Sequence, residues 1–323
     1  MQRETFLIKW VPAVFFSVAI FVAGGVVGCS DSDRVRVDFS SRIDFSRSEK
    51  QEPGAALNVA IASMISPNET IVHYQALLEY LASKIGKKIN LVQRKTYAEV
   101  NDLLGKGVID LAFICSGPYV AGQDSYHFEA LAIPQIHQKP VYRAYLITSQ
   151  ASSVKRLEDL RGKVFAFSDP DSNAGCIVPR FLLAQQGEHP QSFFGKTIFT
   201  YSHDNSILAV SRSIVDAAFV HEHIWEYYSA KNPAVTSRVR IVYTSEPYGN
   251  PPLVASAFMP EPLKQRIREL LFSMHNDRQG VEILGELLID RFIPPNEQLY
   301  DPIRRMLAQT RLQEEGHAAT AKR

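Results

Sequence analysis

The chain has 323 residues and a formal net charge of +1 at pH 7, because 35 basic side chains are balanced by 34 acidic ones. Hydrophobic residues make up 46% of the sequence, an ordinary share for a globular protein. This charge balance argues against a nucleic-acid partner, since nucleic-acid-binding proteins carry a basic excess that matches the phosphate backbone.

The N-terminus has the features of an export signal. Arg3 and Lys9 precede an apolar run over residues 10–22, and small residues stand directly before Cys29. This order is typical of a secretory signal peptide, and the apolar run is shorter than the roughly 20 residues of a spanning helix. The segment before Cys29 resembles a bacterial lipobox, which implies a lipoprotein signal peptide over residues 1–28 and acylation of Cys29. An uncleaved membrane anchor is the alternative.

Residues 29–55 are predicted to form a flexible tether. The stretches 30–33 and 46–54 are polar and charged, and they offer too little apolar surface to offset the entropy lost on ordering. The run Val35 to Phe39 is a candidate for one short strand. The residues after this tether suffice for one large domain or for two lobes.

From Leu57 on, strand-like and helix-like patterns alternate. Apolar residues at three- and four-residue steps predict helices, while short apolar runs between turn residues predict strands. Proline favours the first turn of a helix and glycine favours its end. The first block is expected to contain a strand at 57–62, a helix from Pro67 to Gly86, a strand at 89–92, a helix from Tyr97 to near Gly107, and a strand at 109–115.

A second block repeats this logic. It is expected to contain a strand at 163–167, a polar loop at 168–175, a helix at 177–186, a strand at 196–201, a helix through Ile207 and Val210, a strand at 216–220, a helix with Ile224 and Trp225, and a strand at 238–244. Alternation of this kind predicts parallel sheets with right-handed crossovers. The two blocks and a helical C-terminal part indicate two α/β lobes.

Four polar loops that join a predicted strand to a predicted helix are candidates for an anion site. They span residues 63–68, 115–119, 168–176 and 202–206. Ligands of open α/β sheets bind beyond the carboxyl ends of the strands, where helix N-termini favour negative charge. The alternative is that these loops only cap their helices.

Three segments resemble one known family, the periplasmic binding proteins of phosphate, phosphite and phosphonate transporters. The segment 109–120 ends in a glycine-proline-tyrosine turn, and 167–175 is a loop rich in hydroxyl groups. His203 and Asp204 precede the short apolar segment 215–220. The likeness covers roughly residues 57–303. It implies an α/β fold of the type II periplasmic-binding-protein clamshell class, with two lobes, a central cleft and two crossover segments.

The same resemblance implies domain boundaries, partners and a location. Residues 56–148 with 250–323 would form one lobe and 149–249 the other, with crossings near Thr148 to Val154 and near Ser245 to Pro252. The implied function is that of a periplasmic, lipid-anchored solute-binding protein, which holds a small oxyanion in the cleft for an ABC permease. Neither a cofactor nor an enzyme activity is implied.

The implied ligand-binding residues come from the matched motifs. They are Ser116, Tyr119, Ser172, Asn173, His203 and His221, with Cys115 beside them. The chain departs from the family pattern twice: Ala174 replaces a hydroxyl residue, and His221 stands where the family often has an acidic residue. Because an unperturbed histidine titrates near pH 6.5, His221 would donate a hydrogen bond or add positive charge.

The cysteines keep an alternative function open. Apart from Cys29, only Cys115 and Cys176 are present, either joined in one disulfide or both free. Some proteins that resemble this family sense arsenic oxyanions and signal to a membrane histidine kinase. A thiol at Cys115 would suit trivalent arsenic, because soft ligands bind soft centres. A periplasmic sensor of arsenite or arsenate is therefore the alternative to a transport protein.

Other chemical motifs are weak or missing. The segment His221-Glu222-His223 lacks the i, i+4 histidine spacing of a helical zinc site, so no metal site is predicted. Neither a phosphate-binding loop with lysine nor a Gly-x-Ser-x-Gly motif occurs. Tyr74, Tyr142 and Tyr145 are interpreted as residues of the core or of the cleft rim. We therefore expect a binding protein and not an enzyme.

The lipobox interpretation is testable through Cys29. The substitution Cys29→Ala removes the sulfur that would be acylated, so we expect release from membranes or a block in signal processing. Cell fractionation measures the first and immunoblotting the second. An unmodified Cys29 in the intact mass of the native mature protein would contradict the interpretation.

Overall fold

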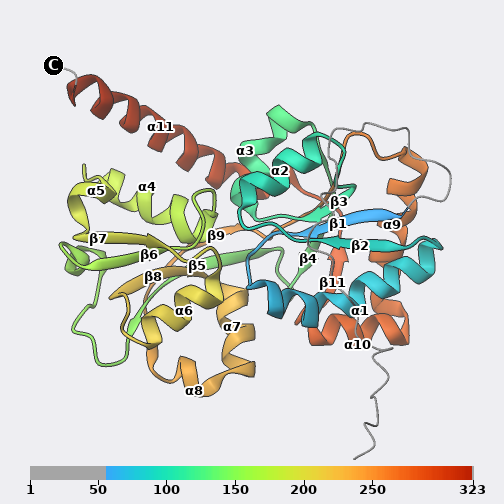
Figure 1. Cartoon of the computed structure of the whole chain (residues 1–323), viewed down its shortest axis with the longest axis horizontal. Helices are drawn as coiled ribbons and strands as arrows, with labels where there is room; N and C mark the ends of the chain where they lie inside the picture. Colours follow the sequence, from blue (N-terminus) through green and yellow to red (C-terminus); the bar gives the residue numbers. More distant parts are fainter. Residues whose placement is uncertain (1–55, 322–323) are drawn as a thin grey trace, which may run out of the picture. The chain divides into compact units, whose positions relative to one another are not determined.

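The computed structural model describes residues 56–321. Cys29, the predicted signal peptide, the predicted tether and the short strand at 35–39 lie outside the described residues. Two sheets organise the described part of the chain (Figure 1). None of the described helices is both long and apolar enough to cross a membrane.

The first lobe is built on a six-stranded sheet with the order β11-β4-β10-β3-β1-β2. Its strands are β1 Leu57–Ile61, β2 Ile89–Val92, β3 Leu111–Phe113, β4 Glu129–Gln135, β10 Leu253–Ala255 and β11 Arg291–Ile293. Strand β1 pairs in parallel with β2 and β3, while β10 runs antiparallel to β3 and β4. The parallel strands bring their carboxyl ends to one edge.

The second lobe is built on a five-stranded sheet with the order β7-β6-β8-β5-β9. Its strands are β5 Val141–Ser149, β6 Val164–Phe167, β7 Lys196–Phe199, β8 Ala217–His221 and β9 Val239–Gly249. Strand β6 pairs in parallel with β7 and β8, and β5 runs antiparallel to β8 and β9. The prediction of two α/β lobes is confirmed.

Helices cover both faces of each sheet (Figure 1). The first lobe carries α1 Pro67–Ile85, α2 Tyr97–Gly105, α3 Ser116–Tyr126, α9 Glu261–Ser273 and α10 Arg278–Glu286. The second lobe carries α4 Val178–Gln185, α5 Pro190–Phe193, α6 His203–Ser211, α7 Glu222–Lys231 and α8 Pro233–Thr236. Short 3₁₀ turns occur at η1 Leu157–Leu160, η3 Met274–Asn276 and η4 Glu297–Tyr300, a π-helical turn occurs at η2 Asn173–Ile177, and α11 Asp301–Ala321 closes the described chain.

Local chemistry fixes several helix ends where the sequence predicted them. Helix α1 begins at Pro67 and ends at Gly86, whose φ of 73° is left-handed and whose N–H bonds to the Ala82 carbonyl. Helix α2 begins with a capping box, in which Thr96 Oγ1 accepts from the Glu99 N–H and the Glu99 carboxylate accepts from the Thr96 N–H. These signals are local, so the sequence shows them directly.

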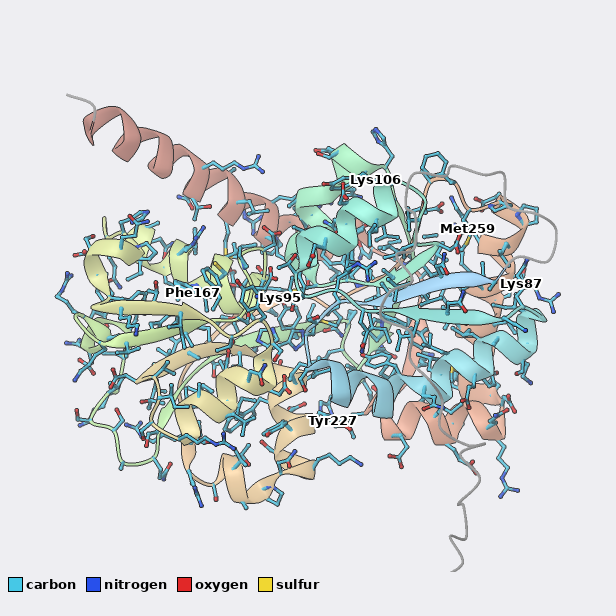
Figure 2. The ribbon with its side chains drawn as sticks, viewed as in Figure 1. Lys87, Lys95, Lys106, Phe167, Tyr227 and Met259 are labelled. Carbon is cyan, nitrogen blue, oxygen red and sulfur yellow. The ribbon has the colours of Figure 1, made fainter. Side chains whose placement is uncertain are left out.

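Alternation along the central strands divides the core between the two faces of each sheet. In β1, Val59 and Ile61 pack with α1, α9 and α10, whereas Ala60 belongs to the cluster that contains α2. Phe167 of β6 is buried in the core of the second lobe (Figure 2). Lys106, which directly follows α2, is exposed to solvent (Figure 2). Because helices cover the parallel strands on both faces, the sequences of these strands are nearly continuous apolar runs.

One hydrophobic cluster reaches from the first sheet to the second. It includes Val254 of β10, Phe165 of β6, and Ile303 and Met306 of α11. Helix α11 starts after η4 and packs against α4 of the second lobe (Figure 1). This helix therefore ties the C-terminal end of the chain to both lobes.

The structure corrects the predicted first crossing at Thr148 to Val154. Strand β5 ends at Ser149 but already belongs to the second sheet, so the chain changes lobe between Gln135 and Val141. The pattern analysis did not identify β4 or β5, because both lie in a stretch without the predicted strand-helix alternation. The second change of sheet falls between Gly249 and Leu253, at the end of the predicted crossing at Ser245 to Pro252.

Asn250 joins the two crossings. Its buried side-chain amide donates to the Pro134 carbonyl at 2.9 Å and to the Lys139 carbonyl at 3.4 Å. Its backbone N–H donates to the Pro140 carbonyl at 2.9 Å, and its own carbonyl accepts from the Tyr300 hydroxyl at 2.8 Å. A single residue therefore holds both connections between the lobes in register.

We expect Asn250→Ala to lower the free energy of unfolding by about 1–3 kcal/mol, because it removes the side-chain donor from the buried Pro134 carbonyl. Asn90→Ala is the matched control, since the Asn90 amide makes an exposed hydrogen bond to Asn58 and its loss should change stability by less than about 0.5 kcal/mol. Urea unfolding followed by circular dichroism measures both. Equal stability of the two variants would contradict this role of Asn250.

Candidate functional site

The loops after the strands place several helix N-termini between the two lobes. Ser172 Oγ accepts from the Gly175 N–H at the start of η2, and Ser202 Oγ accepts from the Asn205 N–H at the start of α6. His221 caps α7, because its Nδ1 accepts from the His223 N–H at 3.2 Å. The predicted capping role of these loops is thus real, but it uses only part of their polar groups.

A buried polar cluster lies where these loops meet. Its members are Tyr97, Cys115, Ser116, Tyr142, Ser172, Asn173, His203 and His221, all at most 2% exposed. The Asn173 side-chain amide donates to the Tyr142 hydroxyl at 2.8 Å, and the Ser116 hydroxyl donates to the Gly249 carbonyl at 2.7 Å. The cluster therefore combines groups from both lobes and from the second crossing.

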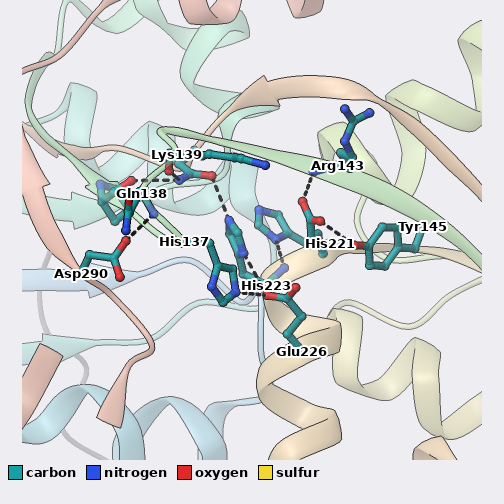
Figure 3. Close-up of polar contacts among 12 residues, drawn as sticks. His137, Gln138, Lys139, Arg143, Tyr145, His221, His223, Glu226 and Asp290 are labelled. Atoms are coloured by element: carbon teal, nitrogen blue, oxygen red, sulfur yellow. Dashed lines mark hydrogen bonds and ion pairs between the residues drawn. The ribbon is translucent and has the colours of Figure 1, made fainter. Parts of the chain in front are cut away.

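Aromatic stacking orients the histidines of the cluster. The Tyr142 ring stacks on the His221 ring with centroids 3.6 Å apart and an interplanar angle of 12°. The His203 ring lies 6.0 Å from the His221 ring, and the His223 ring lies 5.4 Å from it. His221 therefore has ring neighbours in His203, Tyr142 and His223, and Figure 3 shows it beside His223.

Several buried polar atoms of this region have no hydrogen-bond partner among the described residues. They are both ring nitrogens of His203, Nε2 of His221, Oδ1 of Asn173 and Oγ of Ser168. A buried polar atom without a partner costs about 1–3 kcal/mol, and native proteins rarely leave such atoms together. This concentration of unpaired groups marks the cluster as a site for a polar ligand.

The cluster is electrically neutral apart from nearby carboxylates. Burial lowers the pKa of His203 to about 3 and lowers the pKa of His221 well below its usual value. Since Nδ1 of His221 accepts a backbone hydrogen bond, its proton sits on Nε2. Of the two roles expected for His221, donor or cation, the structure therefore favours the neutral donor.

Two carboxylates of the second lobe cap helices of the first. Asp204 Oδ1 accepts from the Ser66 N–H at 3.0 Å, at the start of α1. Asp169 Oδ2 accepts from the Tyr97 N–H at 3.2 Å, at the start of α2. Burial raises the pKa of Asp169 to about 6, although its hydrogen bonds to backbone N–H groups oppose that shift. Each carboxylate thus links the two lobes by accepting a hydrogen bond from a backbone N–H at a helix N-terminus.

Other contacts across the interface are equally close. The His203 N–H donates to the Met64 carbonyl at 3.0 Å. The ammonium of Lys95, in the first lobe, lies 4.1 Å from the ring centroid of Tyr201 in the second (Figure 2). At Gly117 a Cβ atom would lie 2.2 Å from the Asp171 carbonyl oxygen, so only glycine permits this approach of the loops. The lobes are closed over the cluster.

Six of the seven residues expected at the site lie in the cluster: Cys115, Ser116, Ser172, Asn173, His203 and His221. Tyr119 does not. Its hydroxyl donates to Glu297 and its ring packs against Tyr300, with centroids 4.7 Å apart. Tyr119 faces away because this part of α3 packs against η4 and α11.

Three participants were missed or left as core residues: Tyr97, Tyr142 and Asp169. Tyr97 is the first residue of a predicted helix that follows a predicted strand, and this position could have indicated that it lies at the site. Tyr142 lies on β5, a strand that the pattern did not reveal. Asp169 is in a predicted loop, but nothing local indicates that its partner is a helix of the other lobe.

Cys115 and Cys176 are not bonded to each other, and His137 and His223 share one carboxylate partner. Cys115 and Cys176 are both buried and are not joined in a disulfide, so the disulfide alternative is not realised. His223 places Nδ1 3.5 Å from Glu226 and Nε2 3.2 Å from Asn250, and His137 lies 3.0 Å from the same Glu226 carboxylate (Figure 3). Among the described residues, no three His, Cys, Asp or Glu side chains form a group that could hold a metal ion.

Comparison with known proteins agrees with this geometry. Residues 59–300 match the family model described as the periplasmic substrate-binding protein of phosphonate ABC transporters. The phosphonates-binding periplasmic protein of Escherichia coli is 22% identical over 83% of this chain and 80% of its own length. The phosphate-import protein PhnD of Mycolicibacterium smegmatis is 31% identical, but over only 46% of this chain and 50% of that protein.

Solved structures share the fold. The binding-protein component of a phosphonate ABC transporter from Pseudomonas aeruginosa matches with a TM-score of 0.76 and 21% identity, over 81% of this chain and 88% of that one. PhnD1 of Prochlorococcus marinus, solved in complex with methylphosphonate, matches with a TM-score of 0.70 and 18% identity, over 78% and 96%. The type II clamshell predicted from the sequence is therefore confirmed.

The unpaired imidazole of His203 should carry much of the ligand affinity. We expect His203→Ala to raise the Kd for the bound anion by about 10- to 100-fold, since a hydrogen bond to a charged group contributes about 1.5–3 kcal/mol. His203→Gln, which keeps a donor, should recover part of this loss. Isothermal titration calorimetry measures both.

His189→Ala is the control, because it removes a histidine of the same lobe outside the cluster. Thermal unfolding without ligand should show that each variant is folded. An unchanged Kd in His203→Ala would mean that the ligand binds elsewhere.

Proposed function

The chain belongs to the family of periplasmic substrate-binding proteins of phosphonate ABC transporters, and from this premise we propose that it binds a small oxyanion of the phosphate, phosphite or phosphonate type. The ligand would lie in the buried polar cluster and be delivered to an ABC permease. We also propose a lipid anchor at Cys29 on a periplasmic protein, because the family is periplasmic and the lipobox precedes this residue.

The observation that carries the proposal is the pair of neutral, buried imidazoles with unpaired nitrogens at His203 and His221. An oxyanion accepts hydrogen bonds at several oxygens, and each imidazole offers one N–H donor when neutral. Both residues stand at helix starts of the second lobe, where the positive end of the helix dipole favours an anion. Closed lobes strengthen these bonds by excluding water.

The donor at His221 bears on the protonation state of the ligand. An Nε2–H group needs an oxygen with a free lone pair, whereas a carboxylate at this place would need a protonated oxygen. The arrangement therefore favours an anion that is deprotonated at the oxygen facing His221. The missing hydroxyl at Ala174 removes one further donor from the loop.

The contacts of the cluster favour binding over catalysis. A catalytic histidine needs a partner that orients it, but neither nitrogen of His203 has one among the described residues. The neighbouring Asp204 is engaged with the Ser66 N–H instead. Burial also raises the pKa of the Cys115 thiol to about 11, which disfavours a nucleophilic thiolate.

Arsenic sensing is the second candidate, and Cys115 is the observation that favours it. The thiol lies inside the cluster, and the backbone N–H groups of Gly117 and Asn173 offset part of the rise in its pKa. Bound arsenite or arsenate would then be signalled to a membrane histidine kinase. The raised pKa makes this candidate weaker than oxyanion transport, because the thiolate is the form that binds metals and metalloids.

A thermal-shift screen against phosphate, phosphite, methylphosphonate, sulfate, arsenate and arsenite separates the candidates. We expect stabilisation by a phosphorus oxyanion, about 2.7 kcal/mol at a hundredfold excess over Kd. His221→Ala should abolish that shift, whereas Cys115→Ser should leave it nearly unchanged. Loss of an arsenite shift in Cys115→Ser, with His221→Ala unaffected, would instead support the sensor. No shift with any of these anions would contradict both.

A further inference from the structure

His223, near the start of α7, has an oxygen atom beside each of its two ring nitrogens. Nε2 lies 3.2 Å from the side-chain oxygen of Asn250, and Nδ1 lies 3.5 Å from the carboxylate of Glu226. Figure 3 shows the ring beside Glu226. The His223 side chain is only 11% exposed, so the protein largely shields these contacts from water. The protonation state of the ring therefore depends on what the two oxygen atoms can accept.

The amide of Asn250 presents its oxygen to His223, and the other end of the amide fixes this orientation. The amide nitrogen donates to the Pro134 carbonyl at 2.9 Å and to the Lys139 carbonyl at 3.4 Å. A backbone carbonyl only accepts, so turning the amide over would place its oxygen against two acceptors. The oxygen of Asn250 therefore requires a proton on Nε2 of His223.

Glu226 requires a proton at the opposite nitrogen. Hydrogen bonding to His223 has the largest effect on the pKa of Glu226 and lowers it; burial opposes this shift and His137 adds to it. An ionised carboxylate only accepts, so it needs a proton on Nδ1. Either neutral tautomer of His223 would leave one nitrogen lone pair facing an acceptor oxygen. The imidazolium form, which donates from both nitrogens, satisfies both neighbours.

Two further histidines lie near this ring. His221, at the end of β8, accepts the backbone N–H of His223 through its Nδ1, and its ring lies 5.4 Å away. His137, in the first crossing, has Nε2 3.0 Å from the Glu226 carboxylate, but its side chain is 64% exposed, so water can hydrogen-bond to its ring. Of these three histidines, His223 is therefore the one whose two nitrogens both face acceptors within the protein.

The other titratable groups around His223 come from α7, α1 and β5. Glu222, which precedes His223 in α7, accepts from the backbone N–H of Arg143 and from the hydroxyl of Tyr145. Its carboxylate is thus directed to β5 and not to the ring. The nearby phenol groups are those of Tyr74 in α1, Tyr142 in β5 and Tyr227 in α7.

The charged ring would join the second lobe to both crossings. His223 and Glu226 belong to α7 of the second lobe, whereas Asn250 lies in the second crossing and bonds to the first. Rotation at the crossings would separate the ring from Asn250 and remove the need for a proton on Nε2. A histidine without such partners titrates near pH 6.5, so it is mostly neutral above that pH.

We propose that closure of the lobes takes up a proton at His223, whose imidazolium ring then bridges Glu226 and Asn250. This inference rests on the proposed function in one respect, namely that ligand binding closes the lobes. His223 lies outside the buried polar cluster, so it is a positioning residue. Because the closed form holds one more proton than the open form, ligand affinity is highest below about pH 6.5 and falls as the pH rises above it.

Calorimetric titration with methylphosphonate in buffers of different ionisation enthalpy counts the protons taken up on binding. At about pH 7.5 we expect the unaltered protein to take up close to one proton more than Glu226→Gln. In this variant the new amide can donate to Nδ1, so a neutral His223 satisfies both neighbours and binding persists. The protonation of methylphosphonate itself cancels in the difference. Relative to the variant, the affinity of the unaltered protein should fall by up to about tenfold per pH unit above about pH 6.5.

Three further variants locate the proton. His223→Gln keeps the backbone N–H that bonds to His221 and should lose the proton uptake, as Glu226→Gln does. His137→Ala and His189→Ala are the matched controls and should keep it. Thermal unfolding at each pH shows that every variant is folded. Loss of uptake in His137→Ala would place the proton on His137 and overturn the proposal, and so would equal uptake in all the variants.

Nuclear magnetic resonance of the protein labelled with nitrogen-15 at histidine observes the ring directly. With saturating methylphosphonate at about pH 7.5, both ring nitrogens of His223 should carry a proton, and their signals should be absent from His223→Gln. A neutral His223 ring would overturn this proposal and leave the oxyanion site intact. If neither methylphosphonate nor inorganic phosphate binds, the proposed function is wrong. The spectrum of the protein alone then decides: an imidazolium at His223 supports its bridging role, and a neutral ring refutes it.

Discussion

The first N–H groups of every helix lack partners within that helix, and the interface between the lobes is organised around this constraint. Helices α1 and α2 of the first lobe meet carboxylates of the second, Asp204 and Asp169, at hydrogen-bond distance. Burying a carboxylate is costly, as the raised pKa of Asp169 shows, and only such donors make it tolerable. The contact between the lobes therefore also caps α1 and α2.

The same constraint explains why an anion suits the neighbouring cluster. Beside the helix starts at His203 and Asn173, buried side-chain nitrogen and oxygen atoms have no hydrogen-bond partner among the described residues. Part of the interface is thus satisfied by the protein itself, and part is left for a ligand. The donors that the cluster offers are neutral imidazoles, so its attraction for an anion comes from hydrogen bonds and helix starts and not from a cationic side chain.

The connections between the lobes keep these two regions in register. Asn250 bonds to the end of β4, to the first crossing and to η4, and it also meets His223, two residues beyond His221 of the cluster. Helix α11 adds a second link, because it contacts α3 of the first lobe and α4 of the second. Movement at the crossings would therefore reach the cluster through β8 and the start of α7.

The sequence by itself determined β1, β2, β3, α1 and α2 of the first lobe and β6 to β9, α4, α6 and α7 of the second, because periodicity, Pro67 and Gly86 act over a few residues. Strand β2 has the predicted bounds, and six of the seven expected site residues lie in the buried polar cluster. Only the tertiary structure decided that β5 joins the second sheet, that Tyr119 turns toward Glu297, and that Tyr97, Tyr142 and Asp169 meet the cluster. An apolar pocket lined by both lobes was equally invisible, since its walls come from segments that are distant in the sequence. Strand pairing and competition for buried hydrogen-bond partners are long-range, and no local pattern encodes which groups will meet.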